Sequence, residues 1–402
     1  MKITVITKEW PPAVYGGAGV HAVELTRALR ASGVDVSVHA FGEPEQTPDV
    51  HGHAELAELD GANAALRTLG VDLSIAAALA QESPAADVLH SHTWYANLAG
   101  DLASRLTGAP HVLTAHSLEP LRPWKAEQLG GGYRVSSWAE ESAYRGASQV
   151  VAVSAAMRED ILRSYEFLDP DDVAVVHNGI DTADWVRDEG TDVVDALGID
   201  PSRPAVVFVG RITRQKGLPY FLRACASLPP EVQVVLLAGA PDTPGIAAEV
   251  EGLVATLRES RQGVVWVDRM LPRREVCQVL SHATVFVCPS VYEPLGIVNL
   301  EAMACGAAVV GTATGGIPEV VVDGETGWLV PIEQLSDGTG TPVDPDRYVA
   351  DLAAALTEAV SDPERARRFG EAGRVRANQE FSWTTVAART VEVYERALAT
   401  AR

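Results

Sequence analysis

The 402-residue sequence predicts an α/β fold in which two Rossmann-like domains, each a doubly wound parallel sheet, face each other across a cleft. Three observations predict it. Short apolar runs alternate with helical patterns along the first half, the same alternation restarts after residue 204, and a polar, turn-rich segment lies between the halves. Strands that alternate with helices are typical of parallel sheets covered on both faces. At about 150 residues per domain, this length favours two or three domains, and we predict two.

The first domain is predicted over residues 1–181. Its apolar runs have the length of buried strands, and the segments between them have helical periodicity. Strands are expected at 3–7, 34–40, 87–91, 111–114, 150–153 and 173–176, and helices at 20–31, 63–81, 94–106 and 155–165.

The second domain is predicted over residues 193–380, after a linker at 182–192. Asn178-Gly179 supplies turn chemistry just before this linker. Segment 381–402 is expected to hold a C-terminal helix that can pack back on the first domain. Strands are expected at 205–209, 232–238, 264–267, 285–288 and 307–311, and three late helices at 346–360, 363–379 and 383–398.

Composition excludes several classes of protein. The formal charge of −22 argues against a nucleic-acid-binding protein, which needs a basic face for phosphates. The first eight residues contain too short an apolar run for a signal peptide, and no segment is apolar enough to span a membrane. The four cysteines have no metal-type spacing. We therefore expect a cytoplasmic protein without a bound metal or cofactor, and its oligomeric state stays open.

The strongest candidate site is the segment Glu293-Pro-Leu-Gly-Ile-Val-Asn-Leu-Glu301. A helix that begins near Ile297 would present the backbone N–H groups of Leu295, Gly296 and Ile297 to an anion such as a diphosphate. Glu301 would lie one turn inside that helix, and Glu293 on the loop before it. A surface position for the two acids is the alternative, but Ala-Met-Ala-Cys-Gly follows Glu301 and is too small and apolar for a solvent-facing stretch. Ribose and hexose hydroxyls are suitable partners for such carboxylates.

Two cations accompany this segment. Arg211 and Lys216 follow the first predicted strand of the second domain, at the end where ligands bind in doubly wound sheets. An ordinary solvated loop is the alternative for either cation alone. Together with the two glutamates, they indicate a metal-free site for an anionic leaving group.

A glycine loop, Gly16-Gly17-Ala18-Gly19, opens the first long helix. Read as Gly17-x-Gly19-x-x-Ala22, it matches a dinucleotide fingerprint, but the residues from Trp10 to Tyr15 separate it from the preceding strand. A loop that brings backbone N–H groups to a phosphate or a sugar remains possible, and so does a tight turn that only serves packing.

Two further candidates end strands of the first domain. His92 and His116 can face the cleft, although a lone histidine is more often a hydrogen-bonded structural residue. Arg122 and Lys125 can bind an anionic acceptor, or can pair with Glu119 and Glu127. The residues leave both pairs of alternatives open.

These motifs together identify a family. The chain resembles retaining glycosyltransferases of the two-domain GT-B fold, in the branch of glycogen and starch synthases, and is most similar to the actinobacterial group of glycogen and maltose-1-phosphate synthases. The resemblance covers nearly the whole chain. Its marks are Trp10-Pro-Pro-Ala-Val-Tyr-Gly-Gly-Ala-Gly-Val-His21, His90-Ser-His-Thr-Trp94, Thr114-Ala-His-Ser-Leu-Glu-Pro-Leu-Arg-Pro-Trp-Lys125, Gly210-Arg-Ile-Thr-Arg-Gln-Lys-Gly217 and the Glu293/Glu301 pair.

The resemblance implies transfer of glucose from ADP-glucose with retention, to form an α-1,4 bond. It implies that Arg211 and Lys216 stabilise the departing diphosphate, that Glu301 holds the ribose, and that Glu293 holds the hexose. His116 would lie beside the hexose and Gly17 near the phosphates. One departure concerns the glycine loop, since glycogen synthases of the other branch have Lys-x-Gly-Gly-Leu where this chain has Val14-Tyr-Gly-Gly-Ala-Gly.

Several alternatives stay open. The donor can be ADP-glucose or UDP-glucose, and the acceptor glucose 1-phosphate or an α-glucan such as glycogen, with a slight preference for glucose 1-phosphate because of Arg122 and Lys125. A protein that binds a nucleotide sugar without turnover is a second hypothesis. An NAD-dependent oxidoreductase that uses Gly17 and Gly19 is a third.

Overall fold

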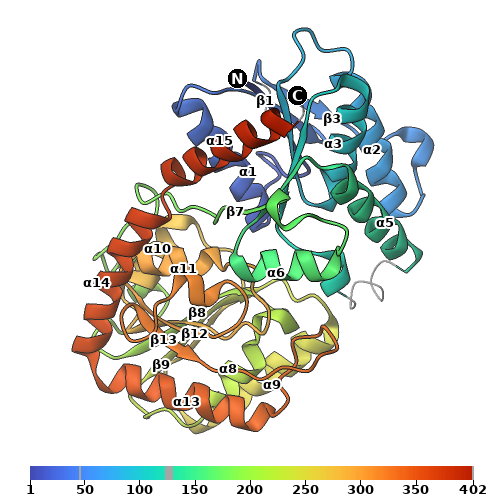
Figure 1. Ribbon diagram of the computed structural model, residues 1–402. Helices are drawn as coiled ribbons and strands as arrows, with labels where there is room; N and C mark the ends of the chain where they lie inside the picture. Colours follow the sequence, from blue (N-terminus) through green and yellow to red (C-terminus); the bar gives the residue numbers. More distant parts are fainter. Residues whose placement is uncertain (45–46, 123–129, 401–402) are drawn as a thin grey trace. The chain divides into compact units, whose positions relative to one another are not determined.

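A computed structural model describes residues 1–44, 47–122 and 130–400 (Figure 1). The chain forms two compact units. Unit 1 comprises the described part of Met1–Gly179 together with the last helix, α15 (Trp383–Thr400), and unit 2 comprises Ile180–Ser382. Each unit contains one parallel sheet with helices packed against it, which confirms the predicted α/β class. The candidate Lys125 lies outside the described residues.

Unit 1 is built on a seven-stranded sheet in the order β3-β2-β1-β4-β5-β6-β7. Every neighbouring pair is parallel, so the carboxyl ends of the strands meet at one edge. The strands are β1 (Lys2–Thr7), β2 (Asp35–Phe41), β3 (Val50–His53), β4 (Val88–His92), β5 (His111–Ala115), β6 (Gln149–Ala152) and β7 (Val173–Val175). The α-helices before α15 are α1 (Gly17–Ala31), α2 (Ala64–Leu79), α3 (Trp94–Thr107), α5 (Gly131–Gly146) and α6 (Ala155–Ser164), and the short 3-10 turns are η1 (Ala57–Leu59), η2 (Glu119–Leu121) and η3 (Pro170–Asp172).

Helix α15 packs on unit 1 although it comes from the far end of the chain. Val393, Tyr394 and Ala397 are buried in the same apolar cluster as Ile3 and Val5 of β1. The hydroxyl of Tyr394 also lies 2.7 Å from Nδ1 of His90 in β4. The helix therefore completes the core of unit 1.

Unit 2 has a six-stranded parallel sheet in the order β10-β9-β8-β11-β12-β13. Its strands are β8 (Ala205–Arg211), β9 (Gln233–Gly239), β10 (Val264–Val267), β11 (Val285–Cys288), β12 (Ala308–Thr312) and β13 (Gly327–Val330). Its helices are α7 (Asp192–Ala196), η4 (Arg214–Lys216), α8 (Leu218–Cys225), α9 (Pro244–Ser260), α10 (Arg273–Ser281), α11 (Ile297–Ala304), α12 (Ile317–Val320), α13 (Pro345–Ser361) and α14 (Pro363–Glu380).

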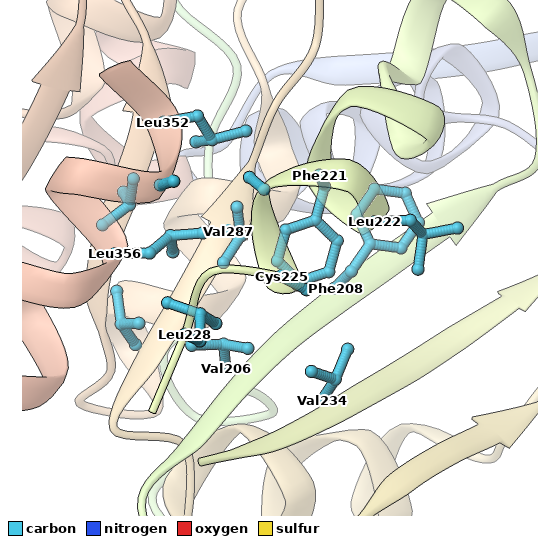
Figure 2. Close-up of a cluster of buried hydrophobic side chains, with 14 of the residues drawn as sticks. Val206, Phe208, Phe221, Leu222, Cys225, Leu228, Val234, Val287, Leu352 and Leu356 are labelled. Atoms are coloured by element: carbon cyan, nitrogen blue, oxygen red, sulfur yellow. The ribbon is translucent and has the colours of Figure 1, made fainter. Parts of the chain in front are cut away.

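One apolar core holds the central strands of unit 2 in place. Figure 2 shows side chains of β8, α8, β9, β11 and α13 that meet in it. Phe208 and Phe221 stack with ring centroids 6.2 Å apart, and both are buried. A buried aromatic side chain of this kind contributes about 3–5 kcal/mol against truncation to alanine. The core fixes β8 and β11, the two strands from which the candidate site extends. The residues of this core that Figure 2 labels are Val206, Phe208, Phe221, Leu222, Cys225, Leu228, Val234, Val287, Leu352 and Leu356.

Among the elements that were not predicted from the sequence are β3, α5 and β13. The strand β3 reads Val-His-Gly-His, without the branched or aromatic run that indicates a strand. Helix α5 begins with two glycines, which are typical of loops.

Among the residues that the structure describes, none of the helices has the length and apolar character that a membrane crossing needs.

Candidate active site

Lys216 lies just beyond the carboxyl end of β8, in the short turn η4. The side-chain oxygen of Thr213 caps this turn by accepting a hydrogen bond from the Lys216 N–H at 3.3 Å. The next residue, Gly217, has φ +64°, a left-handed conformation that glycine adopts without strain. A β-carbon there would lie 1.9 Å from the carbonyl oxygen of Pro289, so only glycine fits. The backbone thus holds Lys216 against the segment that follows β11.

Lys216 makes an ion pair with Glu293. Its Nζ donates to Oε2 of Glu293 at 2.7 Å, and the hydroxyl of Ser290 donates to the same oxygen at 3.0 Å. The Glu293 residue is 7% exposed. Burial alone would lower the pKa of Lys216, but the nearby negative charge of Glu293 reverses this and the pKa is raised. Lys216 is therefore a fixed positive charge at neutral pH.

The loop that carries Glu293 is held by the segment after β12. The Gly316 N–H donates to the Glu293 carbonyl at 2.9 Å. Gly315 has φ +53°, and a β-carbon on it would lie 2.0 Å from the same carbonyl oxygen. This close backbone contact fixes the direction of Glu293 without using its carboxylate.

The predicted helix start at Ile297 is confirmed by α11. Gly296 precedes it with φ +92°, and the helix has no side-chain cap. Leu295 is 1% exposed, which anchors the turn in the core. An uncapped helix start leaves backbone N–H groups available and favours an anion through its dipole. Leu295, Gly296 and Ile297 therefore lie where an anion site was expected.

Glu301 lies one turn inside α11 and is half-buried. Burial raises its pKa to about 7, while the charges of Arg273 and Lys216 oppose the shift. A substantial fraction of Glu301 is therefore protonated at neutral pH. A carboxyl group can accept hydrogen bonds from the vicinal hydroxyls of a ribose when it is ionised, and can also donate one when it is protonated.

Arg211 is placed differently from Lys216. It ends β8, its side chain is 62% exposed, and its guanidinium pairs with Asp242. Within the described part of the chain, no hydrogen bond or ion pair joins Arg211 to Lys216, Glu293 or Glu301. In this structure Arg211 is therefore paired with Asp242 and not with the other candidate residues of unit 2.

In unit 1, the glycine loop surrounds a carboxylate. Glu9 Oε2 accepts hydrogen bonds from the N–H groups of Tyr15 at 3.0 Å and Gly16 at 2.8 Å. A β-carbon on Gly19 would lie 2.6 Å from Glu9. Gly17 begins α1 directly after these two amides. The small residues of this loop therefore have a packing reason, whatever Gly17 itself binds.

His116 belongs to a cluster of histidines at the carboxyl ends of β4 and β5. Its Nε2 lies 3.3 Å from Nδ1 of His92, and its ring centroid lies 4.7 Å from that of His21. Burial lowers the pKa values of His92 and His116 well below the ordinary value, and neighbouring histidines add to the effect. These rings are neutral at pH 7, and Nε2 of His21 and of His92 has no hydrogen-bond partner among the described residues.

Arg122 has partners of its own. Its Nη1 donates to the Ser117 hydroxyl at 3.1 Å and lies 3.8 Å from Oε1 of Glu119. Glu119 is fully buried, and its other oxygen accepts a 2.6 Å hydrogen bond from Ser136. Of the two open alternatives for Arg122, pairing with Glu119 is the one present in this structure.

Sequence reasoning missed Glu9, Ser290, Arg273 and the Gly315-Gly316 turn as parts of the two candidate regions. Ser290 had a readable signal, because it follows β11 directly and stands three residues before Glu293. Glu9 contacts Tyr15 and Gly16, which are close to it in the chain, but no motif marks it. Arg273 and the Gly315-Gly316 turn lie in segments far from their partners, which spacing does not reveal.

Comparison with known proteins agrees with these motifs. The family model described as Glycosyltransferase Family 4 matches residues 15–184, and the one described as Glycosyl transferases group 1 matches residues 191–376. Alpha-maltose-1-phosphate synthase of Mycolicibacterium smegmatis is 55% identical over 399 residues, 98% of this chain and 99% of that protein. The same enzyme of Mycobacterium tuberculosis is 52% identical over 402 residues, 99% and 100% of the two chains. Glycogen synthase of Mycobacterium tuberculosis is 30% identical over 425 residues, 98% and 94% of the two chains.

Solved structures show the same fold. Sucrose-phosphate synthase of Thermosynechococcus elongatus aligns with a TM-score of 0.79 at 24% identity and covers 99% of both chains. Anabaena HepE in complex with UDP-glucose aligns with a TM-score of 0.75 at 20% identity and covers 98% of both. This chain matches the family model for group 1 glycosyl transferases and is 52–55% identical to alpha-maltose-1-phosphate synthases, so the protein is an enzyme, a hexosyltransferase. The chain belongs to the family 4 type glycosyltransferases of the GT-B fold, in the group that contains alpha-maltose-1-phosphate synthases and, at lower identity, glycogen synthases.

Proposed function

We propose that the enzyme transfers glucose from ADP-glucose, with retention, to O4 of an α-linked glucose acceptor. Glucose 1-phosphate is the favoured acceptor, which gives maltose 1-phosphate, and an α-glucan is the second. Names of relatives support this choice, because alpha-maltose-1-phosphate synthases match the whole chain at 52–55% identity and glycogen synthase only at 30%. The reaction belongs to glycogen biosynthesis and takes place in the cytoplasm, a reducing setting that suits four free cysteines.

The observation that carries the proposal is the Lys216–Glu293 pair beside the uncapped start of α11. A departing nucleoside diphosphate gains negative charge as the glycosidic bond breaks. In this proposal the charge of Lys216 and the N–H groups of Leu295, Gly296 and Ile297 stabilise that negative charge, and groups that are in place before reaction are an effective form of electrostatic catalysis. Arg211 adds a second cation once it leaves Asp242. No metal is needed for this task.

The remaining roles follow from the family resemblance. Glu293 accepts hydrogen bonds from hydroxyls of the transferred glucose, and Glu301 holds the ribose. His116, a neutral imidazole, hydrogen-bonds the glucose, and the backbone of Gly17 approaches the diphosphate. Arg122 and Lys125 receive the phosphate of glucose 1-phosphate.

Retention follows from reaction on one face of the sugar. The bond between glucose C1 and the diphosphate oxygen breaks, the bond between C1 and the acceptor O4 forms on the same face, and the acceptor proton passes to the leaving phosphate. The products are ADP and the α-1,4-linked disaccharide phosphate, so atoms and charge balance. This route needs no carboxylate nucleophile.

The donor and the acceptor are tested together. ADP-glucose and UDP-glucose are each offered with glucose 1-phosphate or with glycogen, and the sugar product is identified by mass spectrometry. Maltose 1-phosphate from ADP-glucose and glucose 1-phosphate is the expected result. Glucan extension with no disaccharide phosphate would overturn the acceptor, and preference for UDP-glucose would overturn the donor. Binding of nucleotide sugar without nucleoside diphosphate release, or tight NAD binding instead, would support the other two hypotheses.

A further inference from the structure

A second group of histidines lies in unit 1, on strands that carry none of the proposed catalytic residues. Strand β3 is the edge strand of the sheet, and its register with β2 places His51 directly beside His39. Their ring centroids are 4.8 Å apart. Glu82, three residues after the end of α2, lies against the same point, with Oε1 2.7 Å from Nε2 of His39.

We propose that His39, His51 and Glu82 bind one divalent transition-metal ion, of which Zn²⁺ is the best fit. One ligand atom from each residue lies within 4.8 Å of the other two, and the three residues come from three separate segments. Two imidazoles and one carboxylate are a common ligand set for zinc. Water would complete a tetrahedral site.

The spacing of the ligand atoms suits such an ion. Zinc bonds of about 2.0–2.2 Å to nitrogen and oxygen place neighbouring tetrahedral ligands about 3.3 Å apart. His39 Nε2 and Glu82 Oε1 need only separate slightly from their 2.7 Å hydrogen bond to reach that spacing. His51 is exposed and His39 is buried, so an ion can enter from solvent at His51 and meet a fixed ligand behind it.

A hydrogen-bond chain holds His39 from the interior. Its Nδ1 lies 2.9 Å from Nε2 of His53, and Nδ1 of His53 lies 3.1 Å from the hydroxyl of Ser74. The Glu82 carboxylate only accepts hydrogen bonds when ionised, so His39 carries its proton on Nε2 in the free protein. Burial lowers the pKa values of both His39 and His53, which keeps both rings neutral and able to bind a metal at pH 7.

The chain can reverse when a metal binds. His39 then carries its proton on Nδ1 and donates it to His53, and His53 donates from its own Nδ1 to Ser74. Each ring keeps one proton, both hydrogen bonds of the chain from His39 to Ser74 are preserved, and the bond between His39 and Glu82 is replaced by the metal. Metal-bound histidines characteristically donate their second nitrogen in this way, which fixes the ring and strengthens the ligand.

The charges around the group also favour a cation. The carboxyl end of α2, which carries the negative end of the helix dipole, is three residues from Glu82. Lys2 opposes the ion, because its Nζ lies 3.5 Å from Oε2 of Glu82. The other described histidine cluster, His21, His92 and His116, contains no carboxylate, and His21 and His92 lie close to the starts of α1 and α3, where the dipole disfavours a cation.

The site would join the edge strand to its neighbour and to the loop after α2. Because a ligand that binds only the folded state stabilises it, zinc should raise the unfolding temperature of unit 1. Edge strands are the parts of a sheet that most need such protection.

The test is a titration of chelator-treated, full-length protein with Zn²⁺, followed by calorimetry and by thermal unfolding. We expect one ion per chain at this site and a rise of the unfolding temperature by a few degrees. His51→Ala removes an exposed ligand without disturbing the core and should weaken binding at least tenfold, as should Glu82→Gln. His282→Ala, which removes a histidine of unit 2, is the matched control and should leave the zinc affinity unchanged.

Lys2→Gln gives a second, opposite readout. Removal of the opposing charge should tighten zinc binding several-fold, an effect that chance binding to a surface histidine would not show. Equal zinc affinity of the wild type and His51→Ala would overturn the proposal, because any zinc would then bind at another site. Absence of binding below millimolar zinc would overturn it as well. Neither outcome depends on the transferase reaction.

Discussion

Lys216 Nζ and Glu293 Oε2 lie 2.7 Å apart, although 77 residues separate them in the sequence. They are brought together by β8 and β11, which are neighbours in the unit 2 sheet. The pair keeps one positive and one negative group desolvated side by side in the absence of substrate. In the proposed reaction, the donor would separate these two charges when it binds.

Replacement of Lys216 tests this site most directly. Lys216→Ala should lower kcat by about 10²–10³, the usual effect of removing one group that stabilises developing charge. Arg214→Ala is the control, because Arg214 lies in the same turn but its side chain is 76% exposed and pairs with Glu249. Steady-state kinetics with ADP-glucose, together with the unfolding temperature of both variants, measures the effect. Near-normal turnover of Lys216→Ala would exclude its assigned role.

Gly217 offers a test of the backbone that positions Lys216. Gly217→Ala should destabilise unit 2 and abolish most activity, because the added β-carbon collides with the Pro289 carbonyl. Gly198→Ala is matched to it, since Gly198 also has a positive φ, +75°, but open space around it. The control should lose only the conformational cost of about 1–2 kcal/mol. Denaturant unfolding of the two variants separates the cost of the collision from the cost of the positive φ. An equal loss in the free energy of unfolding would show that the contact with Pro289 contributes nothing to it.

Much of the geometry around Lys216 and Glu293 was predictable, because it depends on short stretches of sequence. The start of α11 at Ile297 and the apolar strands β8 and β11 depend on glycine and on apolar runs, which the sequence displays directly. The pairing of Arg211 with Asp242 and the contact of Gly315 with Glu293 arise from the way distant segments pack. No spacing rule reports such contacts.

The misses in unit 1 have two different reasons. The sequence left the glycine loop open between a loop that binds a phosphate or sugar and a tight turn that serves packing, and the structure shows that the Glu9 carboxylate accepts from the amides of Tyr15 and Gly16. Glu9 stands before the loop with no pattern of its own. The edge strand β3 has two histidines in four residues, and only its pairing with β2 reveals their neighbour His39.

Glu301 provides a prediction about pH. Its pKa in the folded protein, about 7, lies above the ordinary value of 4.5, so the folded state binds more protons between these values. The stability that Glu301 contributes is therefore lost as pH rises from about 4.5 to about 7. Glu301→Gln should remove this loss and raise the unfolding temperature of the free enzyme at pH 8 more than at pH 5.

The same variant should bind the donor less well. A glutamine keeps one donor and one acceptor but loses the charge, so we expect KM for ADP-glucose to rise about tenfold or more, as for the loss of a charge-assisted hydrogen bond. Glu371→Gln, on an exposed turn of α14, is a control for both measurements. A stability gain that is equal at both pH values would contradict the raised pKa.

Arg122 gives the last prediction, which concerns the acceptor. If its guanidinium leaves Glu119 to bind the phosphate of glucose 1-phosphate, Arg122→Ala should raise KM for that acceptor about 10- to 100-fold, because hydrogen bonds between charged groups are worth about 1.5–3 kcal/mol. KM for ADP-glucose should stay within a factor of about two, since the donor roles are assigned to other residues. Arg145→Ala, on the exposed face of α5 where it pairs with Glu141, is the matched control in the same unit. With glycogen as acceptor the Arg122 variant should act like the wild type, because a glucan has no phosphate to lose. An equal loss with both acceptors would instead show that Arg122 serves only to compensate the buried charge of Glu119.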